Sequence, residues 1–299
     1  MSYVLAADIG GTNIRAAIVD AEGSILTEQR IEATLSEPGL SAEEMLQRIV
    51  NIVQPMLNHN IKAVGLGFPG FFRGTSGILA ASPNLPEIKE FALADALRTA
   101  INIPVAAQND ALCAAIGEHK FGAGKDKQNL FHITLGTGVG GGLILNHAPW
   151  TGESGMAMEF GHLHVAQERL CGCGLHGCLE TYASATAVCN RYYEVTNEQH
   201  NAAHIYQLAC DGNNIAKDAI TQAGYYLGIA IAEAIKLLDL HTVTISGGLT
   251  GAWPILHPIM LETLNKRLIP PLRNRVEILP TSLGDQAGLL GAAAIAQNQ

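Results

Sequence analysis

The sequence has few basic residues and no long apolar run. Lys and Arg together number 18 against 27 Asp and Glu, so the formal net charge of the 299 residues is −9. Proteins that bind nucleic acids usually present a basic surface, and this balance argues against that class. No stretch reaches the roughly 18 to 20 continuous apolar residues that a membrane-spanning helix needs. The opening residues, MSYVLAADIGG, lack the features of a secretory signal, and we expect a cytoplasmic protein.

Cysteine is also scarce. Only 6 residues are cysteine, and cytoplasmic thiols are normally kept reduced, so a disulfide framework is not expected. Three of the six lie in one segment, EFGHLHVAQERLCGCGLHGCLE, residues 159–180. The other three, Cys113, Cys189 and Cys210, lie in helical or apolar contexts. We expect these three to be buried and to fill space in the core.

Two common site motifs are missing, and a third occurs in the wrong context. The sequence has no GxxxxGK[ST] and no HExxH, which argues against a P-loop nucleotide site and against a metalloprotease of the HExxH type. The letters GTGVGG match a dinucleotide-binding fingerprint, but they lead into an expected strand rather than a helix. This context argues against a Rossmann dinucleotide site.

Glycine, by contrast, is abundant at 32 residues and falls in short clusters after strand-like runs. The main clusters are DIGGT at 8–12, GTGVGGG at 136–142 and SGG at 246–248. Glycine lets backbone N–H groups approach phosphate oxygens, Thr12 adds a donor, and Asp8 can hold Mg²⁺ directly or through water. We expect the first two clusters to bind phosphate and the third to accept a base or ribose. Any one of them alone is equally typical of a hairpin turn.

The hydrophobic pattern predicts an α/β protein with an internal repeat. A strand, a glycine turn and a second strand occur near residue 8 and again near residue 136, which suggests two related α/β halves with facing glycine turns and a hinge. Apolar runs and helical spacing predict the elements. The expected strands are 3–8, 14–20, 25–31, 62–68, 105–108, 129–135, 142–145, 242–246 and 275–279, and the expected helices are 41–58, 91–100, 111–121, 216–240 and 285–296.

Asn109 and Asp110 stand where an expected strand ends and a helix begins. Both residue types are favoured as helix N-caps, and capping alone would explain them. A carboxylate at this point could also accept the proton of an attacking hydroxyl. The two roles are compatible, and we treat Asp110 as a candidate general base.

The cysteine segment suggests a metal site. A disulfide between Cys171 and Cys173 would close a small, strained ring, and three thiols would leave one unpaired. Three thiolates and one imidazole would instead make a closed, structural zinc site. The spacing alone allows His162, His164 or His176 as the fourth ligand of a site that includes Cys178.

The sequence as a whole resembles the ROK sugar kinases, which have the actin/hexokinase-like (ribonuclease H-like) ATPase fold. The resemblance runs along nearly the whole chain through DIGGTNIRAA, GLGFPG, NDALCAAIGE, LGTGVGGGLI, EFGH, CGCGLHGCLETYAS, SGG and GDQAGLLGAA. It implies two domains that flank a cleft. The first is 1–108, completed by the C-terminal helix 285–299, and the second is 109–284 with the zinc loop.

The resemblance also implies roles for individual residues. It implies transfer of phosphate from ATP with Mg²⁺ to the 6-hydroxyl of a hexose, with Asp110 as general base and a structural Zn²⁺. Zinc would fix the ring of its histidine ligand, which could then face a sugar hydroxyl. The implied sugar contacts are Asn84, Asn109, Asp110, Glu159, His162 and Glu180; the implied nucleotide contacts are Asp8, Gly10, Gly11, Thr12, Gly136, Thr137, Gly138, Gly247 and Gly248; the implied zinc ligands are His162, Cys171, Cys173 and Cys178.

Several alternatives follow from the same residues. Some ROK proteins are repressors with an added helix-turn-helix, for which DIGGT at residue 8 leaves no room. A sugar sensor without chemistry would not need Asp110, and a zinc hydrolase would need an open metal position. The segments EFGHLHV, LGTGVGGGLI and LIPPLRNRVEIL resemble bacterial N-acetylglucosamine kinases more closely than glucokinases. This resemblance implies N-acetylglucosamine as the sugar, with glucose, N-acetylmannosamine and fructose as alternatives. We expect a homodimer that binds neither nucleic acid nor membrane.

Overall fold

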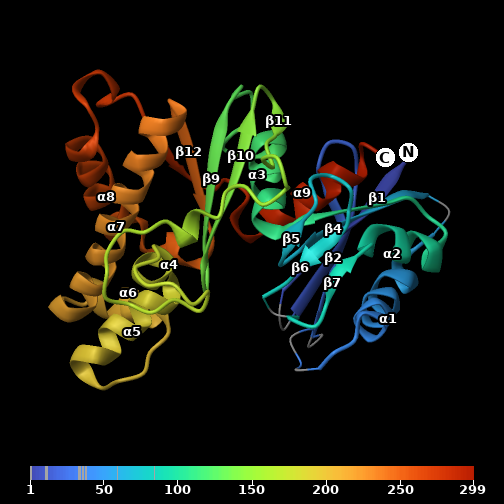
Figure 1. Ribbon diagram of the computed structural model, residues 1–299, viewed down its shortest axis with the longest axis horizontal. Helices are drawn as coiled ribbons and strands as arrows, with labels where there is room; N and C mark the ends of the chain where they lie inside the picture. The colour runs from blue at the N-terminus through green and yellow to red at the C-terminus, as the bar shows by residue number, and fades with distance from the viewer. Residues whose placement is uncertain are drawn as a thin grey trace. The chain divides into compact units, whose positions relative to one another are not determined.

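The computed structural model describes residues 2–10, 13–32, 35, 37, 39–58, 60–83 and 85–299 (Figure 1). Gly11, Thr12 and Asn84, three of the implied site residues, lie outside these ranges. The chain divides into two compact units. Unit 1 comprises Met1–Gln128, Gly142–Met158 and Gln286–Gln299, and unit 2 comprises Asn129–Gly141 and Glu159–Asp285.

Unit 1 is built on a five-stranded sheet of order β3-β2-β1-β4-β8. Strand β2 runs antiparallel to β1 and β3, whereas β4 runs parallel to β1 and β8. A second, three-stranded sheet has the order β5-β6-β7. The strands are β1 (Tyr3–Ile9), β2 (Asn13–Val19), β3 (Ile25–Glu32), β4 (Ile61–Phe68), β5 (Phe71–Phe72), β6 (Leu79–Ala81), β7 (Lys89–Phe91) and β8 (Val105–Asn109); the helices are α1 (Ala42–Val53), η1 (Gln54–Met56), α2 (Leu93–Ile101), α3 (Asp110–Phe121) and α9 (Ala287–Ala296).

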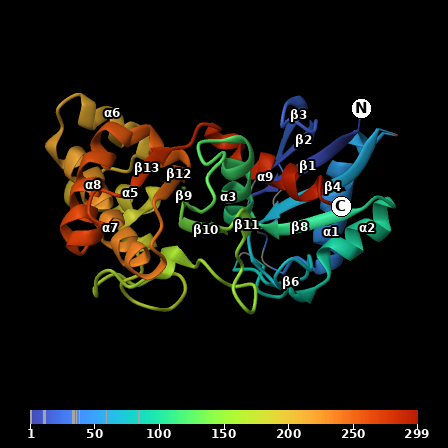
Figure 2. The same cartoon turned by 90° about the horizontal axis from the view of Figure 1, so that it is seen from above.

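Alternation along β4 separates the two faces of this sheet. Val64 and Leu66 belong to the buried cluster that includes Met45 of α1 and Leu97 of α2. Gly65, between them, faces α9 so closely that a Cβ atom there would overlap the backbone of α9. Helices α1 and α2 therefore cover one face of the sheet, and α3 and α9 pack side by side on the other (Figure 2).

Glycine makes the contact between α3 and α9 unusually close. A Cβ atom on Gly291 would overlap the carbonyl of Cys113, and one on Gly117 would overlap the carbonyl of Ala287. Seven of the ten residues of α9, whose sequence is AGLLGAAAIA, are alanine or glycine. The two helix backbones can approach each other only because these positions lack side chains.

A second five-stranded sheet has the order β11-β10-β9-β12-β13; its strands β9, β12 and β13 belong to unit 2, and β11 belongs to unit 1. Strand β12 runs parallel to β9 and β13, just as β4 runs parallel to β1 and β8. The two sheets thus share one strand order, and the expected repeat is confirmed. The division between the units falls within β10. The strands are β9 (Leu130–Leu135), β10 (Val139–Leu145), β11 (Ala148–Pro149), β12 (Thr242–Ser246) and β13 (Glu277–Pro280).

Two long helices pack together in unit 2. Helix α7 is capped by Asn213, whose side chain accepts a hydrogen bond from the Ala216 N–H group. It packs against α8 along Gly224 and Gly228, where Cβ atoms would crowd the α8 carbonyls of Leu256 and Met260 (Figure 1). The helices are η2 (Phe160–His162), α4 (Glu180–Ala183), α5 (Ala185–Thr196), α6 (Ala202–Cys210), α7 (Asn214–Leu238), η3 (Gly248–Ala252), α8 (Trp253–Arg267), η4 (Pro270–Leu272) and η5 (Gly284–Gln286).

Some sequence expectations need correction. The glycine turn expected at 136–142 is shorter, because β10 already begins at Val139. Cys210 is exposed and Cys189 is half-buried, so the expectation that both are buried was wrong, whereas Cys113 is buried. Residues 109–128 belong to unit 1, in which α3 packs on α9. The domain boundary that the resemblance implies at residue 109 stays a prediction.

Over the part of the chain that the structure describes, no helix has both the length and the apolar character required to cross a membrane.

Candidate functional site

Asn109 and Asp110 lie at the carboxyl end of β8, and only one of them caps the helix that follows. The Asn109 side chain accepts a hydrogen bond from the Leu112 N–H group at 3.0 Å and donates one to the Gly70 carbonyl at 3.1 Å. Asn109 is therefore the N-cap of α3. Asp110 is the first residue of the helix, and its Oδ1 atom accepts a 2.9 Å hydrogen bond from the Ala111 N–H group. Its carboxylate is not needed as the cap.

The environment of Asp110 shifts its protonation. Burial of the carboxyl group raises the pKa of Asp110 above its ordinary value, and the hydrogen bond from Ala111 opposes this shift only in part. A carboxylate with a raised pKa holds a proton more readily, as a general base must when a hydroxyl gives one up. The residue as a whole is half-buried, so it can still be reached from outside.

Asp8 lies at the end of β1, close to the start of α9. A Cβ atom on Gly288 would lie 3.1 Å from both carboxylate oxygens of Asp8. The buried thiol of Cys113 lies nearby, and its pKa is raised well above the ordinary value by burial and further by Asp8 and Asp110. The thiol therefore stays protonated and neutral beside the two acids. Gly10 follows, and its N–H group donates a 2.9 Å hydrogen bond to the Asn13 carbonyl.

The turn after β9 is fastened to the start of α5. The Gly136 carbonyl accepts a 2.9 Å hydrogen bond from the Ala185 N–H group, and the Thr137 carbonyl accepts a 2.7 Å bond from the Thr186 hydroxyl. These contacts consume carbonyl oxygens and leave the turn with a fixed backbone. A fixed glycine turn suits the recognition of an anion by backbone N–H groups.

The Glu180 side chain also contacts the turn after β9. Its Oε2 atom accepts a 3.0 Å hydrogen bond from the Val139 N–H group, while its Oε1 atom lies 4.0 Å from the Cys171 Sγ atom. A Cβ atom on Gly138 would overlap Oε2. The absence of a side chain at Gly138 therefore allows Glu180 to occupy its position between the turn and the cysteine segment.

The turn after β12 contains Gly247 and Gly248. Gly247 has φ +95°, a conformation that strongly favours glycine, and a Cβ atom there would overlap the Leu135 carbonyl of β9. The Gly247 carbonyl accepts hydrogen bonds from both the N–H group and the hydroxyl of Thr250, at 3.0 and 2.7 Å. Around Gly248, a Cβ atom would meet nothing within 4 Å, so that residue faces open space.

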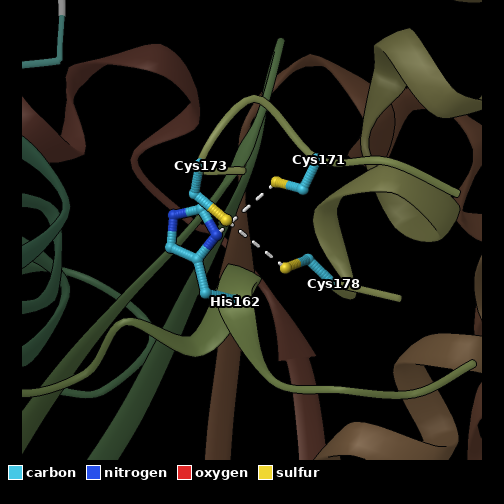
Figure 3. A group of neighbouring side chains, drawn as sticks. All are labelled: His162, Cys171, Cys173 and Cys178. Atoms are coloured by element: carbon cyan, nitrogen blue, oxygen red, sulfur yellow. Dashed lines mark hydrogen bonds between the residues drawn. The ribbon is translucent and has the colours of Figure 1, made fainter. Parts of the chain in front are cut away.

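His162 and three cysteines form one cluster (Figure 3). Their ligand atoms all lie within 4.8 Å of one another. The Cys171 Sγ atom lies 3.7 Å from His162 Nδ1, and the Cys173 and Cys178 Sγ atoms are 3.6 Å apart, so these thiols are free rather than joined in a disulfide. Of the three histidines that the spacing allows, His162 is the one in this cluster; His164 and His176 instead belong to residue pairs that bridge the segment.

The donor set of the cluster fits a tetrahedral cation. Ligands at about 2.3 Å from a tetrahedral zinc ion are separated by about 3.8 Å, which is close to the distances in this group. Burial raises the pKa of Cys178 to about 12, whereas the Leu175 N–H group lowers the pKa of Cys173. Thiol ligands bind zinc as thiolates, and the charge of the cation would favour that ionisation.

The imidazole of His162 has two distinct sides. Its Nδ1 atom faces the thiols, and its Nε2 atom lies 3.8 Å from the Glu159 Oε2 atom. Glu159 is exposed and His162 is half-buried. One nitrogen is therefore available to the cluster and the other to a ligand at the surface, with an acid beside it.

Sequence reasoning missed a cavity of about 380 Å³ in unit 2. The residues rich in hydroxyl groups directly after the cysteine segment, TYASAT, were the available signal. The cavity adjoins the glycine turn and Glu180, so it is continuous with residues that the sequence did identify. Its lining comprises Thr137, Arg169, Leu170, Gly172, Glu180, Thr181, Ser184, Thr186, Ala187 and Asn190.

Comparison with known proteins gives consistent relatives along the full chain. A glucokinase of Streptomyces coelicolor is 31% identical over 317 residues, covering 99% of this chain and 98% of that protein. An N-acetyl-D-glucosamine kinase of Haemophilus influenzae is 31% identical over 310 residues, covering 96% of this chain and 97% of that protein. A solved ROK family glucokinase of Streptomyces griseus, in complex with glucose and AMPPNP, is 31% identical with a TM-score of 0.87 and full coverage of both chains.

The family profile agrees with these relatives. The sequence profile described as ROK family matches residues 4–299. The repeated strand order, together with the match to the Streptomyces griseus structure, identifies the fold as the actin/hexokinase-like ATPase fold. The chain belongs to the ROK family.

Proposed function

We propose that the protein is a sugar kinase that transfers the terminal phosphate of ATP to the 6-hydroxyl of a hexose. Asp110 carries the proposal, because its carboxyl group stands at a strand end with a raised pKa and no capping duty. The full-length similarity to glucokinases and to an N-acetylglucosamine kinase supports the same activity. A glucokinase relative that binds glucose and AMPPNP supports ATP as the phosphate donor.

The proposed chemistry assigns a task to each group of residues. The oxygen of the sugar hydroxyl attacks the γ-phosphorus while Asp110 accepts the hydroxyl proton, and ADP leaves. Asp8 would hold Mg²⁺, which when bound would supply positive charge to balance that of the phosphates. Backbone and hydroxyl donors of the glycine turns bind the phosphates, and the turn after β12 holds the nucleoside. The proposed phosphate contacts are Gly10, Gly11, Thr12, Gly136, Thr137 and Gly138, with Gly247 and Gly248 for the nucleoside. The N–H groups of Gly10 and Gly136 already donate to the Asn13 and Gly138 carbonyls, so these two glycines would contribute close approach of the backbone rather than a donor.

Polar side chains orient the sugar. Asn109 offers an amide beside the base, and the acids Glu159 and Glu180 accept hydrogen bonds from sugar hydroxyls. His162 Nε2 can contact a further hydroxyl, because Nδ1 is turned toward the thiols. Asn84 completes the proposed set and lies outside the described residues. Acids and amides of this kind are suited to a polyhydroxylated ligand.

For the sugar itself, we propose N-acetylglucosamine, with glucose as the second candidate. The first choice rests on the segments EFGHLHV, LGTGVGGGLI and LIPPLRNRVEIL, which resemble bacterial N-acetylglucosamine kinases more closely than glucokinases. The glucokinase and the N-acetylglucosamine kinase are equally similar at 31% identity, which keeps glucose in contention. Contacts with ring hydroxyls that both sugars share cannot discriminate between them, so discrimination must come from the surroundings of the 2-substituent.

A substrate panel tests both levels of the proposal. We would measure ADP release with N-acetylglucosamine, N-acetylmannosamine, glucose and fructose, and compare kcat/KM. We expect N-acetylglucosamine to lead, because a pocket that bonds the acetamido group leaves polar groups unpaired with glucose. A lead for glucose or fructose would contradict the sugar assignment only. The absence of sugar-dependent ADP release with any of the four would contradict the kinase assignment.

We also propose that His162, Cys171, Cys173 and Cys178 hold a structural Zn²⁺. The support is the donor set and the mutual distances within 4.8 Å. Bound zinc would supply a fixed, closed cross-link and no open position for chemistry. His162 Nδ1 and Glu180 Oε1 both lie close to the Cys171 Sγ atom. A fixed metal site would therefore hold the His162 ring and the Glu180 carboxylate in fixed orientations.

Metal analysis of purified protein tests this site. We expect one zinc per chain, and about tenfold to hundredfold weaker sugar binding after its removal, because binding of structural zinc is coupled to local folding. Cys173→Ser should lose the metal. Cys210→Ser is the matched control, since Cys210 is a free, exposed cysteine outside the cluster. Metal-free wild-type protein, or equal zinc content in the two variants, would contradict the site.

A further inference from the structure

His132 is an imidazole enclosed by the core of unit 2. It lies on β9 between Phe131 and Ile133, and all three residues are 0% exposed. A buried imidazole needs a partner at each ring nitrogen. His132 finds both on β12, with Nδ1 2.8 Å from the Thr244 hydroxyl and Nε2 2.9 Å from the Ser246 hydroxyl.

The chemistry of these bonds restricts the arrangement. A neutral imidazole donates at one nitrogen and accepts at the other, so one of the two hydroxyls accepts from the ring and the other donates to it. Burial lowers the pKa of His132 to about 3, which keeps the ring neutral at physiological pH. The ring therefore connects two hydroxyls of one strand through a pair of complementary hydrogen bonds.

The register between β9 and β12 explains why the His132 ring bonds two residues of β12. β9 and β12 are parallel, and His132 lies opposite Thr244. Thr244 and Ser246 are two residues apart, so their side chains point to the same face of the sheet. The ring thus bonds its direct neighbour and also reaches forward to Ser246, the last residue of β12.

Beyond Ser246 the chain enters the Gly247 turn. A Cβ atom on Gly247 would overlap Leu135, the last residue of β9. The turn is therefore seated directly on the end of β9, where the other glycine turn of unit 2, residues 136–138, begins. A small shift of Ser246 along the strand would alter this close contact and displace the Gly247 carbonyl that accepts from Thr250.

We propose that His132 is a positioning residue for the nucleotide: its bond to the Ser246 hydroxyl holds the Gly247–Gly248 turn in place for the nucleoside. This inference rests on the proposed function, because it takes the ligand of the turn to be ATP. The competing explanation is that His132 only stabilises the sheet. The two hydroxyls separate these explanations, because Ser246 adjoins the turn whereas Thr244 lies two residues before it.

The test compares Ser246→Ala with Thr244→Val. Each variant removes one hydroxyl and leaves one nitrogen of His132 unpaired, so both should lower stability. For Ser246→Ala we expect the KM for ATP to rise on the order of tenfold, with kcat and the KM for sugar within about twofold of wild type. For Thr244→Val the KM for ATP should stay within about twofold of wild type. Ser246→Thr retains a hydroxyl and should restore the KM for ATP.

Amide hydrogen exchange gives a second measurement that needs no turnover. We expect faster exchange at the Thr250 amide in Ser246→Ala and unchanged exchange there in Thr244→Val. Equal effects of the two variants on the KM for ATP, or unchanged Thr250 exchange in Ser246→Ala, would overturn the proposal. Failure of the wild type to bind an ATP analogue would overturn the proposed function and the nucleotide role together, whereas faster exchange confined to Ser246→Ala would still support positioning of the turn.

Discussion

At the residue scale, the neighbouring pair Asn109 and Asp110 shows how capping and chemistry can be separated. The Asn109 side chain accepts from the Leu112 N–H group and so caps α3. The sequence placed both residues at a strand end but could not assign the cap, because either side chain can serve there. A substitution at Asp110 therefore changes the carboxylate without removing the cap.

We expect Asp110→Asn to retain the fold and to lower kcat by about a hundredfold or more, because only the proton acceptor is lost. Its free energy of unfolding at pH 7 should equal or exceed that of wild type. The pKa of Asp110 is raised in the folded state, so ionisation disfavours folding above that pKa. This gain should disappear as the pH falls toward the unfolded pKa of about 3.9. ADP-release kinetics and urea unfolding at pH 7 and 4 check both points, and near wild-type turnover would refute the role.

Gly138 gives a second prediction at this scale. Gly138→Ala would push a methyl group into the Glu180 carboxylate and break its bond to the Val139 N–H group. We expect kcat/KM to fall by about tenfold or more, since the change disturbs both the turn and a proposed sugar contact. Gly251→Ala is the control, because a Cβ atom there meets nothing within 4 Å. Similar kinetics for the two variants would contradict the steric argument.

At the scale of elements, the sequence predicted the regular strands better than the helices of unit 2. The strand at Thr242–Ser246 consists mostly of β-branched residues and is followed by glycines, so its sequence predicts a strand that ends in a turn. Helices α5, α6 and α8 were not predicted. Helix α8 contains Pro258 and has apolar residues on several sides, which hides a helical period. The strands β5, β6 and β7 have only two or three residues each, too few to show alternation.

The cysteine segment shows a similar limit. Its spacing indicated three thiols at one site but left three candidate histidines. The choice depends on tertiary structure, because the short helix η2 carries His162 toward the thiols while His164 pairs with Cys178 in a β-bridge. Local spacing does not determine such pairing. The roles of Glu159 and Glu180 likewise depend on contacts that the sequence does not specify.

Close packing of α3 and α9 leads to a prediction about stability. Alanine is a better helix former than glycine by about 1 kcal/mol, so propensity alone predicts that Gly291→Ala stabilises the protein. The overlap of a Cβ atom with the Cys113 carbonyl predicts the reverse. We expect a net loss of about 1–3 kcal/mol, measured by urea unfolding, because crowding in a packed interface forces backbone shifts. A stabilised variant would show that the two helices can separate at little cost.

At the scale of the whole molecule, acid stability should depend on His132. Its folded pKa of about 3 lies below the ordinary value of 6.5, because burial disfavours the charged ring. Between these values the unfolded chain binds a proton and the folded chain does not, so stability is present above the window and is lost as the pH falls. This group alone contributes a slope of up to about 1.4 kcal/mol per pH unit.

We expect His132→Gln, which cannot titrate, to show a shallower loss of unfolding free energy between pH 6 and 4 than wild type. The variant should be less stable at pH 7, since glutamine cannot reproduce both hydrogen bonds of the ring. Urea unfolding at several pH values measures the two slopes. Equal slopes would mean that the pKa of His132 in the folded state is not lowered.

The position of α9 also has a consequence for synthesis on the ribosome. Unit 1 needs Gln286–Gln299, yet its first segment ends at Gln128. At roughly 5–20 residues per second, the first segment waits on the order of ten seconds or more for the helix that covers one face of its sheet. During that interval most of unit 2, the continuous segment Glu159–Asp285, has left the ribosome. The nascent chain thus leaves one face of its sheet only partly covered, by α3, and open to chaperones and proteases until α9 is made. Its earliest residues are therefore among the last to reach their final packing.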